Sequence, residues 1–123
     1  MKVLVADDSR MMRTVIRRSL ETLKVDTILE AADGAEAVTL YQDNTDVDLV
    51  LSDWNMPNKT GIEVLREIRA QDSKVPVILI TTEADRSRVM EAIEAGVSDY
   101  IVKPFDTETL REKLEKHGCG ACA

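Results

Sequence analysis

The sequence is poor in aromatic residues, in histidine and in long apolar stretches. Of 123 residues, 3% are aromatic and one is a histidine, although 44% are apolar, so the core must be aliphatic. No apolar run approaches the ~20 residues that span a bilayer, and Met1-Lys2-Val3 leads into a strand rather than a signal peptide. The formal charge of −7 argues against direct binding of nucleic acid, which relies on neutralising phosphates. We therefore expect a soluble cytoplasmic domain without membrane insertion.

Cysteine is confined to the last residues of the chain. Cys119 and Cys122 have the spacing of half a zinc site, and His117 could add a third ligand. A structural zinc site needs four ligands, and the chain has no further cysteine or histidine. We interpret residues 118–123 as a flexible tail with two free thiols, following a single domain that covers residues 1–117.

Strand-like and helix-like segments alternate along the whole chain. The predicted strands lie near residues 2–6, 27–31, 47–52, 76–81 and 98–103, and the predicted helices near 9–23, 34–43, 60–70, 85–95 and 106–117. Strict alternation predicts an α/β fold, a doubly wound parallel sheet with helices on both faces. The pattern does not fix the strand order. The core-facing residues predicted for the helices include Met12, Val15, Ile16, Ile62, Leu65, Ile68, Val89, Ala92 and Ile93.

Polar side chains follow four of the predicted strands. Asp7 and Asp8 end the first, Asp53 the third, Thr81 the fourth and Lys103 the fifth. The carboxyl ends of parallel strands meet at one edge, where such folds bind ligands. Carboxylate oxygens at that edge suit Mg²⁺, which keeps several waters and shares phosphate oxygens. The set favours a phosphoryl-transfer site with Asp53 as nucleophile.

Each of these residues also has a simpler interpretation. Asp7 or Asp8 could cap the helix that begins near Arg10. Lys103 could extend its ammonium group into water, and Thr81 could be an ordinary strand residue. We favour the metal interpretation for the two aspartates with Asp53, and an ion pair with Asp53 for Lys103.

Two longer motifs carry a resemblance to a known family. They are Ser52-Asp53-Trp54-Asn55-Met56-Pro57-Asn58 and Tyr100-Ile101-Val102-Lys103-Pro104-Phe105. With the Asp-Asp pair and the threonine at family distances, the sequence resembles a bacterial two-component response-regulator receiver domain, in particular the chemotaxis regulators. The match spans residues 2 to about 116. It implies a flavodoxin-like (βα)5 sheet with strand order 2-1-3-4-5.

The resemblance also implies roles for the residues at the edge of the sheet. Asp53 would accept a phosphoryl group from a histidine kinase, while Lys103 and Thr81 would contact the phosphoryl oxygens. Mg²⁺ would be held by Asp8, Asp53 and the backbone carbonyl of Asn55, with Asp7 acting through water. Asn55 and Glu83 would flank the path of the hydrolysing water and so set the lifetime of the acyl phosphate.

The implied output surface comprises the fourth helix, the fifth strand and the fifth helix. Its residues would be Arg86, Val89, Tyr100 and Lys113, with Tyr100 changing its burial on activation. In an alternative interpretation, Arg86 and Lys113 belong to a solvated helix face and Val89 to the core. Arg10, Arg13 and Arg17 follow one another at helical spacing, either as a solvent-facing stripe or as a contact for the phosphohistidine partner.

The function expected from the sequence is a stand-alone, monomeric regulator rather than an enzyme beyond its own phosphorylation and dephosphorylation. Its target would be a protein, most simply the flagellar motor switch. A phosphorelay intermediate, or a receiver cut from a larger regulator, remains an alternative. A haloacid-dehalogenase-like phosphatase would need a second aspartate at position 55, which is asparagine. A degenerate receiver that only binds proteins would not need the complete acidic site.

Overall fold

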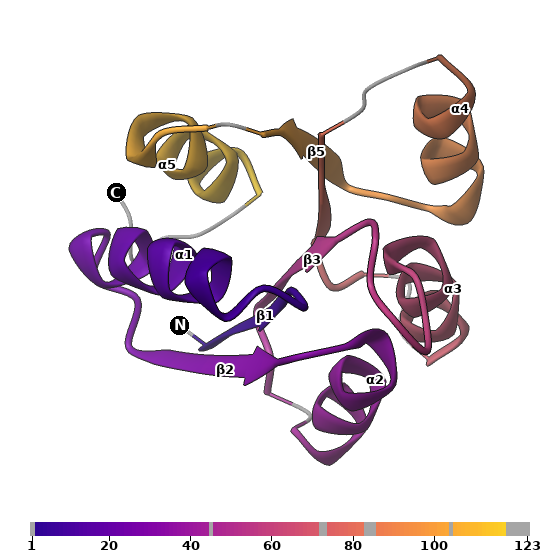
Figure 1. Ribbon diagram of the computed structural model, residues 1–123, viewed down its shortest axis with the longest axis horizontal. Coiled ribbons are helices and arrows are strands. Elements are labelled where there is room, and N and C mark those ends of the chain that lie inside the picture. Colours follow the sequence, from indigo (N-terminus) through magenta and orange to yellow (C-terminus); the bar gives the residue numbers. More distant parts are fainter. Residues whose placement is uncertain (1, 45, 72–73, 83–85, 104, 118–123) are drawn as a thin grey trace.

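The protein is a five-stranded parallel sheet between two layers of helices, described here from a computed structural model (Figure 1). The structure describes residues 2–44, 46–71, 74–82, 86–103 and 105–117. The strands are β1 (Lys2–Ala6), β2 (Thr27–Ala31), β3 (Leu49–Asp53), β4 (Val77–Thr81) and β5 (Asp99–Val102). The helices are α1 (Arg10–Thr22), α2 (Gly34–Asp43), α3 (Gly61–Gln71), α4 (Arg86–Ala95) and α5 (Thr107–Lys116). The predicted alternation and fold class are confirmed.

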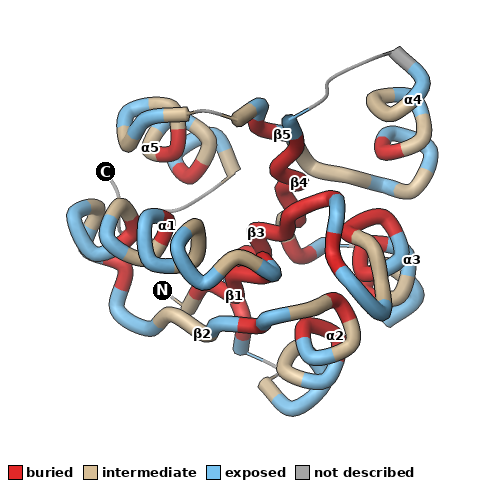
Figure 2. The backbone as a smooth tube through the Cα atoms, in the orientation of Figure 1, coloured by how far each residue is buried: buried red, intermediate tan, exposed pale blue. Residues whose placement is uncertain are grey.

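The sheet has the order β2-β1-β3-β4-β5, as the resemblance implied. Helices α1 and α5 cover one face, and α2, α3 and α4 cover the other (Figure 1). The three central strands are buried along most of their length (Figure 2). Alternate residues of β1 enter opposite cores, Leu4 with α2 and α3, and Val5 with α1 and α5. Among the described residues, no helix has the length and apolarity that crossing a bilayer requires.

Of the nine core-facing helix residues predicted above, five are buried, Met12 and Val89 are half-buried, and two are exposed. Ile16, Ile62, Leu65, Ile68 and Ala92 are all buried. Val15 and Ile93 were expected in the core, but they are 46% and 58% exposed. Both lie beside a residue that already fills the helix–sheet contact, Ile16 in α1 and Ala92 in α4, so the apolar stripe of each helix is wider than the surface that it covers.

The helix ends explain why the loops at the edge of the sheet have fixed shapes. Ser9 caps α1, because its side chain accepts a hydrogen bond from the Met12 amide at 3.2 Å. The alternative in which Asp7 or Asp8 caps this helix is therefore wrong. At the opposite edge of the sheet, Gly96, with φ of +93°, ends α4 in the left-handed conformation. Asp106 caps α5 through the Thr109 amide, as expected.

Candidate phosphoryl-transfer and metal site

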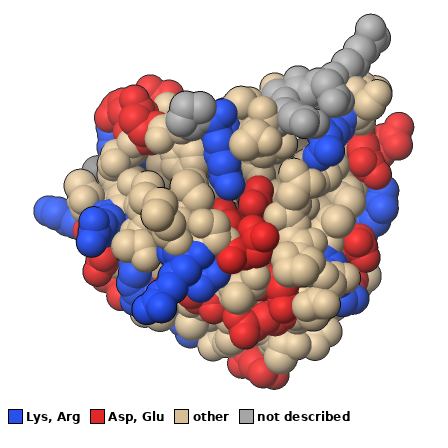
Figure 3. Space-filling model, in the orientation of Figure 1, with Lys and Arg blue, Asp and Glu red and all other residues tan. Residues whose placement is uncertain are grey.

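The strand ends bring the predicted carboxylates together at one edge of the sheet. Asp7, Asp8 and Asp53 each offer a carboxylate oxygen, and these oxygens lie within 4.8 Å of one another. Asp7 is fully buried, Asp53 is 8% exposed, and Asp8 faces solvent. Figure 3 shows acidic side chains gathered near the middle of this face, with basic side chains beside them. The described part of the chain thus contains a three-carboxylate cluster that is open on one side.

Backbone hydrogen bonds fix the residues that carry these side chains. The Asp7 amide donates to Ala31 in β2 at 3.1 Å, and the Trp54 amide donates to Ile80 in β4 at 2.9 Å. Asp53 itself is the last residue of β3, one position later than the predicted end of this strand. The hydrogen bonds of the sheet therefore continue to the residues that carry the carboxylates and set their positions.

Lys103 joins two of the three carboxylates. Its Nζ lies 3.3 Å from Asp7 Oδ2 and 3.4 Å from Asp53 Oδ2. The Lys103 amide donates to the Thr81 carbonyl at 2.8 Å, so the strand pairing of β4 and β5 aims this side chain. The simpler interpretation, an ammonium group extended into water, is wrong, and the predicted ion pair with Asp53 is present.

The electrostatics of the cluster oppose ionisation of Asp53. Burial raises the pKa of the Asp53 carboxyl, and the nearby Asp7 carboxylate raises it further. Lys103 lowers this pKa through its charge and its hydrogen bond, but the net direction is upward. An added positive charge would stabilise the ionised form of the Asp53 carboxyl. The cluster is therefore suited to binding a cation.

The loop after Asp53 is held from two sides. Gly61 begins α3 against the end of β3, and a Cβ added there would lie 2.4 Å from the Asp53 carbonyl oxygen. Asn58, with φ of +67°, donates from its side chain to Asp33 Oδ2 at 2.8 Å. These contacts fix the segment that contains Asn55, which is exposed. Gly61 was not among the predicted site residues, although a glycine at the start of a helix near a strand end indicates close backbone approach.

Thr81 lies at the end of β4, buried and facing a small hollow. The hollow has a volume of about 10 Å³, and Trp54, Thr81, Arg88, Val89, Ala92 and Tyr100 line it. Arg88 lies over the Trp54 ring, with 5.3 Å between the guanidinium carbon and the ring centroid. Tyr100 is 38% exposed. The structure therefore connects the residue after Asp53 with α4 and β5, a link that sequence spacing did not reveal.

The predicted output residues lie on this side of the molecule, with two differences from the expectation. Val89 is half-buried beside the hollow, and Lys113 donates to Asp99 Oδ1 at 3.0 Å instead of extending into solvent. The side chain of Arg86 and the whole of Glu83 lie outside the described residues. So do Pro104 and the tail at 118–123, so the interpretations of these segments stay predictions.

A groove of about 390 Å³ opens beside the cluster. Its walls are Met12 and Val15 from α1, Phe105 after β5, Thr82 after β4, and Lys103. Lys103 therefore belongs to both the groove and the carboxylate cluster. The exposure of Val15 has a local explanation here, because the side chain forms part of the groove wall.

The chain belongs to the response regulator receiver domain family, whose model matches residues 3–115. Within that family, it is 45% identical over 117 residues to a chemotaxis protein CheY homologue from Campylobacter jejuni, covering 94% of this chain and 90% of the relative. The structure of CheY4 from Vibrio cholerae superposes with a TM-score of 0.87 at 34% identity, covering 94% of this chain and 96% of that one.

A third comparison concerns the metal. The receiver domain of a Pseudomonas aeruginosa sensor histidine kinase, solved with magnesium coordinated in its active-site cleft, superposes with a TM-score of 0.85 at 32% identity. The superposition covers 94% of each chain. These findings confirm the predicted family and fold. Receiver domains of the CheY family are regulators, not enzymes that act on a separate substrate.

Proposed function

We propose that this chain accepts a phosphoryl group on Asp53 from a histidine kinase, in a reaction that depends on Mg²⁺. The observation that carries the proposal is the position of Asp53 Oδ2, 3.4 Å from Lys103 Nζ and beside two further carboxylates. Asp53 supplies the nucleophilic oxygen, and Lys103 supplies a positive charge for the phosphoryl oxygens. Phosphoryl transfer needs little covalent help beyond such positioning and charge neutralisation.

The residues present fit Mg²⁺. The ion prefers oxygen ligands at about 2.0–2.1 Å and retains waters when few protein ligands are offered. Asp8 and Asp53, together with the backbone carbonyl of Asn55, would hold it, and Asp7 would act through bound water. When bound, Mg²⁺ would neutralise charge on the carboxylates and the phosphoryl oxygens. The solvent-facing side of the cluster at Asp8 leaves space for the waters and the donor.

The chemical step is a substitution at phosphorus. An oxygen of the Asp53 carboxylate attacks, the phosphorus–nitrogen bond of the phosphohistidine breaks, and the electron pair leaves with the imidazole. Lys103 stays protonated and contacts one phosphoryl oxygen, while the Thr81 hydroxyl donates to another. Water then attacks the acyl phosphate, which regenerates the Asp53 carboxylate and releases phosphate. In this scheme the exposed Asn55, together with Glu83, adjusts the approach of that water.

The signal would leave through the face formed by α4, β5 and α5. Tyr100 and Val89 adjoin the hollow next to Thr81, so movement of Thr81 toward a phosphoryl group changes the space available to Tyr100. Arg86 and Lys113 complete this surface in the proposal. Because the similar proteins are named as chemotaxis regulators, the proposed target is the flagellar motor switch. A phosphorelay histidine is the alternative target.

The test of this function is phosphorylation by a small phosphodonor such as acetyl phosphate with Mg²⁺. We expect the parent protein to form a base-labile acyl phosphate, and Asp53→Asn to form none while keeping its fold by circular dichroism. Asp26→Asn is the matched control, because Asp26 is an exposed acid that directly precedes β2, at the edge of the sheet opposite Asp53. It should label like the parent. Undiminished base-labile phosphate in Asp53→Asn would contradict the assignment.

A further inference from the structure

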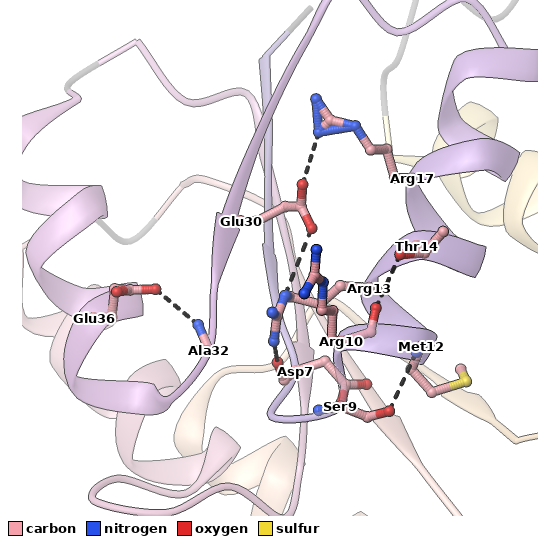
Figure 4. A network of polar contacts seen from close by, with 10 residues as sticks. All are labelled: Asp7, Ser9, Arg10, Met12, Arg13, Thr14, Arg17, Glu30, Ala32 and Glu36. Carbon is pink, nitrogen blue, oxygen red and sulfur yellow. Dashed lines mark hydrogen bonds and ion pairs between the residues drawn. The ribbon is translucent and has the colours of Figure 1, made fainter.

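Two arginines of α1 turn back toward β2 rather than into solvent. Arg13 Nε lies 3.5 Å from Glu30 Oε1, and Arg17 Nη1 lies 2.8 Å from Glu30 Oε2 (Figure 4). The Arg13 side chain is 16% exposed, whereas that of Arg17 is 40% exposed. The two arginines therefore share one carboxylate, but Arg13 is the more enclosed of the pair.

Arg13 also contacts the backbone of the carboxylate cluster. Its Nη1 donates to the carbonyl oxygen of Asp7 at 2.6 Å (Figure 4). That carbonyl belongs to the peptide that joins Asp7 to Asp8. The other groups of Asp7 are fixed as well, since its amide donates to Ala31 and its Oδ1 accepts from the Ser9 amide at 2.8 Å. The bond from Arg13 thus restrains the peptide plane from which Asp8 extends.

We propose that Arg13, held by Glu30, is a positioning residue for the metal site. It fixes the peptide between Asp7 and Asp8, so that the exposed Asp8 carboxylate faces Asp53 before a cation arrives. This inference rests on the proposed function, because it takes Asp8 and Asp53 to be Mg²⁺ ligands. Groups behind metal ligands typically change metal affinity about 10–100-fold when they are removed.

The hydrogen bond and the charge of Arg13 should have opposite effects on Mg²⁺ affinity, so the positioning role can be tested. The guanidinium is a positive charge near a cation site, so its loss alone would strengthen Mg²⁺ binding. Loss of its hydrogen bond would instead free the Asp7–Asp8 peptide and weaken binding. Arg17 is the matched control, because it carries the same charge and contacts the same partner, Glu30, whereas the bond to the Asp7 carbonyl comes from Arg13.

The experiment is a Mg²⁺ titration of the parent, Arg13→Ala, Arg13→Lys and Arg17→Ala, followed by Trp54 fluorescence and repeated by calorimetry. We expect Arg13→Ala to raise the Mg²⁺ dissociation constant about 10-fold. Arg17→Ala should change it less than about twofold, or lower it slightly through loss of charge. Arg13→Lys should fall between, because an ammonium group can donate to the carbonyl but lacks the planar fork that also reaches Glu30.

The outcomes separate the inference from the function on which it rests. Mg²⁺ binding by Arg13→Ala that equals or exceeds the parent's would overturn the positioning role, as would equal losses in Arg13→Ala and Arg17→Ala. If Arg13→Ala does not fold, as judged by circular dichroism without metal, Arg13→Lys alone decides, and parental affinity in that variant overturns the proposal. A parent protein that binds no Mg²⁺ at millimolar concentration would contradict the proposed function instead.

Discussion

At the scale of single residues, Asp53 shows a conflict between folding and chemistry. It is almost buried, its carboxylate oxygen lies within 4.8 Å of those of two other aspartates, and its ion-pair partner Lys103 is shared with Asp7. Burial of like charges costs stability unless a positive charge compensates. The arrangement is unfavourable for the metal-free fold, and it is favourable for binding a cation and a phosphoryl group.

The unfavourable burial of the Asp53 carboxylate predicts that a variant without this carboxylate is more stable than the parent when no metal is bound. Asp53→Asn removes one carboxylate and keeps a side chain of the same shape, so we expect its thermal unfolding midpoint to exceed the parent's by a few degrees in chelator at pH 7. Saturating Mg²⁺ should reduce this difference, because the ion stabilises the parent by mass action. Calorimetry with and without Mg²⁺ measures both. A variant less stable than the parent in chelator would contradict the argument.

The two aspartates at the end of β1 should differ in their effect on metal binding. Asp8 is exposed and free to turn toward an ion, whereas Asp7 is fully buried and engaged by Ser9 and Lys103. We expect Asp8→Ala to weaken Mg²⁺ binding more than Asp7→Ala in a Trp54 fluorescence titration, since it removes a direct ligand. Equal losses, or a titration of Asp8→Ala that matches the parent, would count against this division of roles.

At the scale of elements, the sequence predicted what depends on periodicity and on strand ends. The ten elements, the buried central strands and the meeting of Asp7, Asp53 and Lys103 follow from alternation and from parallel topology. The strand order was predicted only from the family resemblance, because hydrophobic periodicity does not indicate which strands are neighbours. The contacts Arg13–Asp7 and Arg88–Trp54 were missed, because a surface arginine at helical spacing looks the same whether or not it turns inward.

The junction of β5 and α5 is stabilised by one carboxylate. Asp99 Oδ2 lies 3.0 Å from His117 Nε2, and Asp99 Oδ1 accepts from Lys113 Nζ at 3.0 Å. Burial acts to raise the pKa of Asp99, but the hydrogen bonds from His117, Lys113 and the Tyr100 amide outweigh it and lower this pKa to about 2. Asp99 therefore fixes Lys113, a residue of the proposed output surface.

The lowered pKa of Asp99 predicts a defined pH dependence of stability. A carboxyl with a depressed folded-state pKa stabilises the fold above its unfolded value, near 3.8, and this stability is lost as the pH falls toward 2. Asp99→Asn should cost about 1–2 kcal/mol of unfolding free energy at pH 7, below the full linkage value because solvent screens part of the interaction. Urea unfolding from pH 7 to 3 should show the difference shrinking below about pH 4. A constant difference would contradict the prediction.

At the scale of the whole molecule, the proposed signal must cross from the edge of the sheet to α4 and β5. The path is short, because Trp54, Thr81 and Tyr100 line the same hollow. Its volume of about 10 Å³ is at the lower limit of what can hold one water molecule, and it is far too small for the ring of Tyr100. Inward movement of Tyr100 thus requires its neighbours to move with it. Packed cores change between discrete arrangements, so a two-state shift is the expected behaviour.

Filling the hollow should therefore separate phosphorylation from output. Ala92 is buried at the hollow, and Ala92→Leu adds volume where Tyr100 would have to move, at an overpacking cost of about 1–3 kcal/mol. We expect acetyl phosphate still to label Asp53 in this variant, because its side chain enlarges α4 rather than the carboxylate cluster. Glu94→Leu, which adds the same side chain at an exposed position of α4, is the control.

The readout is fluorine NMR of fluorotyrosine-labelled protein, with beryllofluoride and Mg²⁺ as phosphoryl mimic. The spectra should report a change at Tyr100 in the parent and in Glu94→Leu, but a much smaller one in Ala92→Leu. An undiminished change in Ala92→Leu would mean that Tyr100 does not use this space, and that the output face is switched by another route.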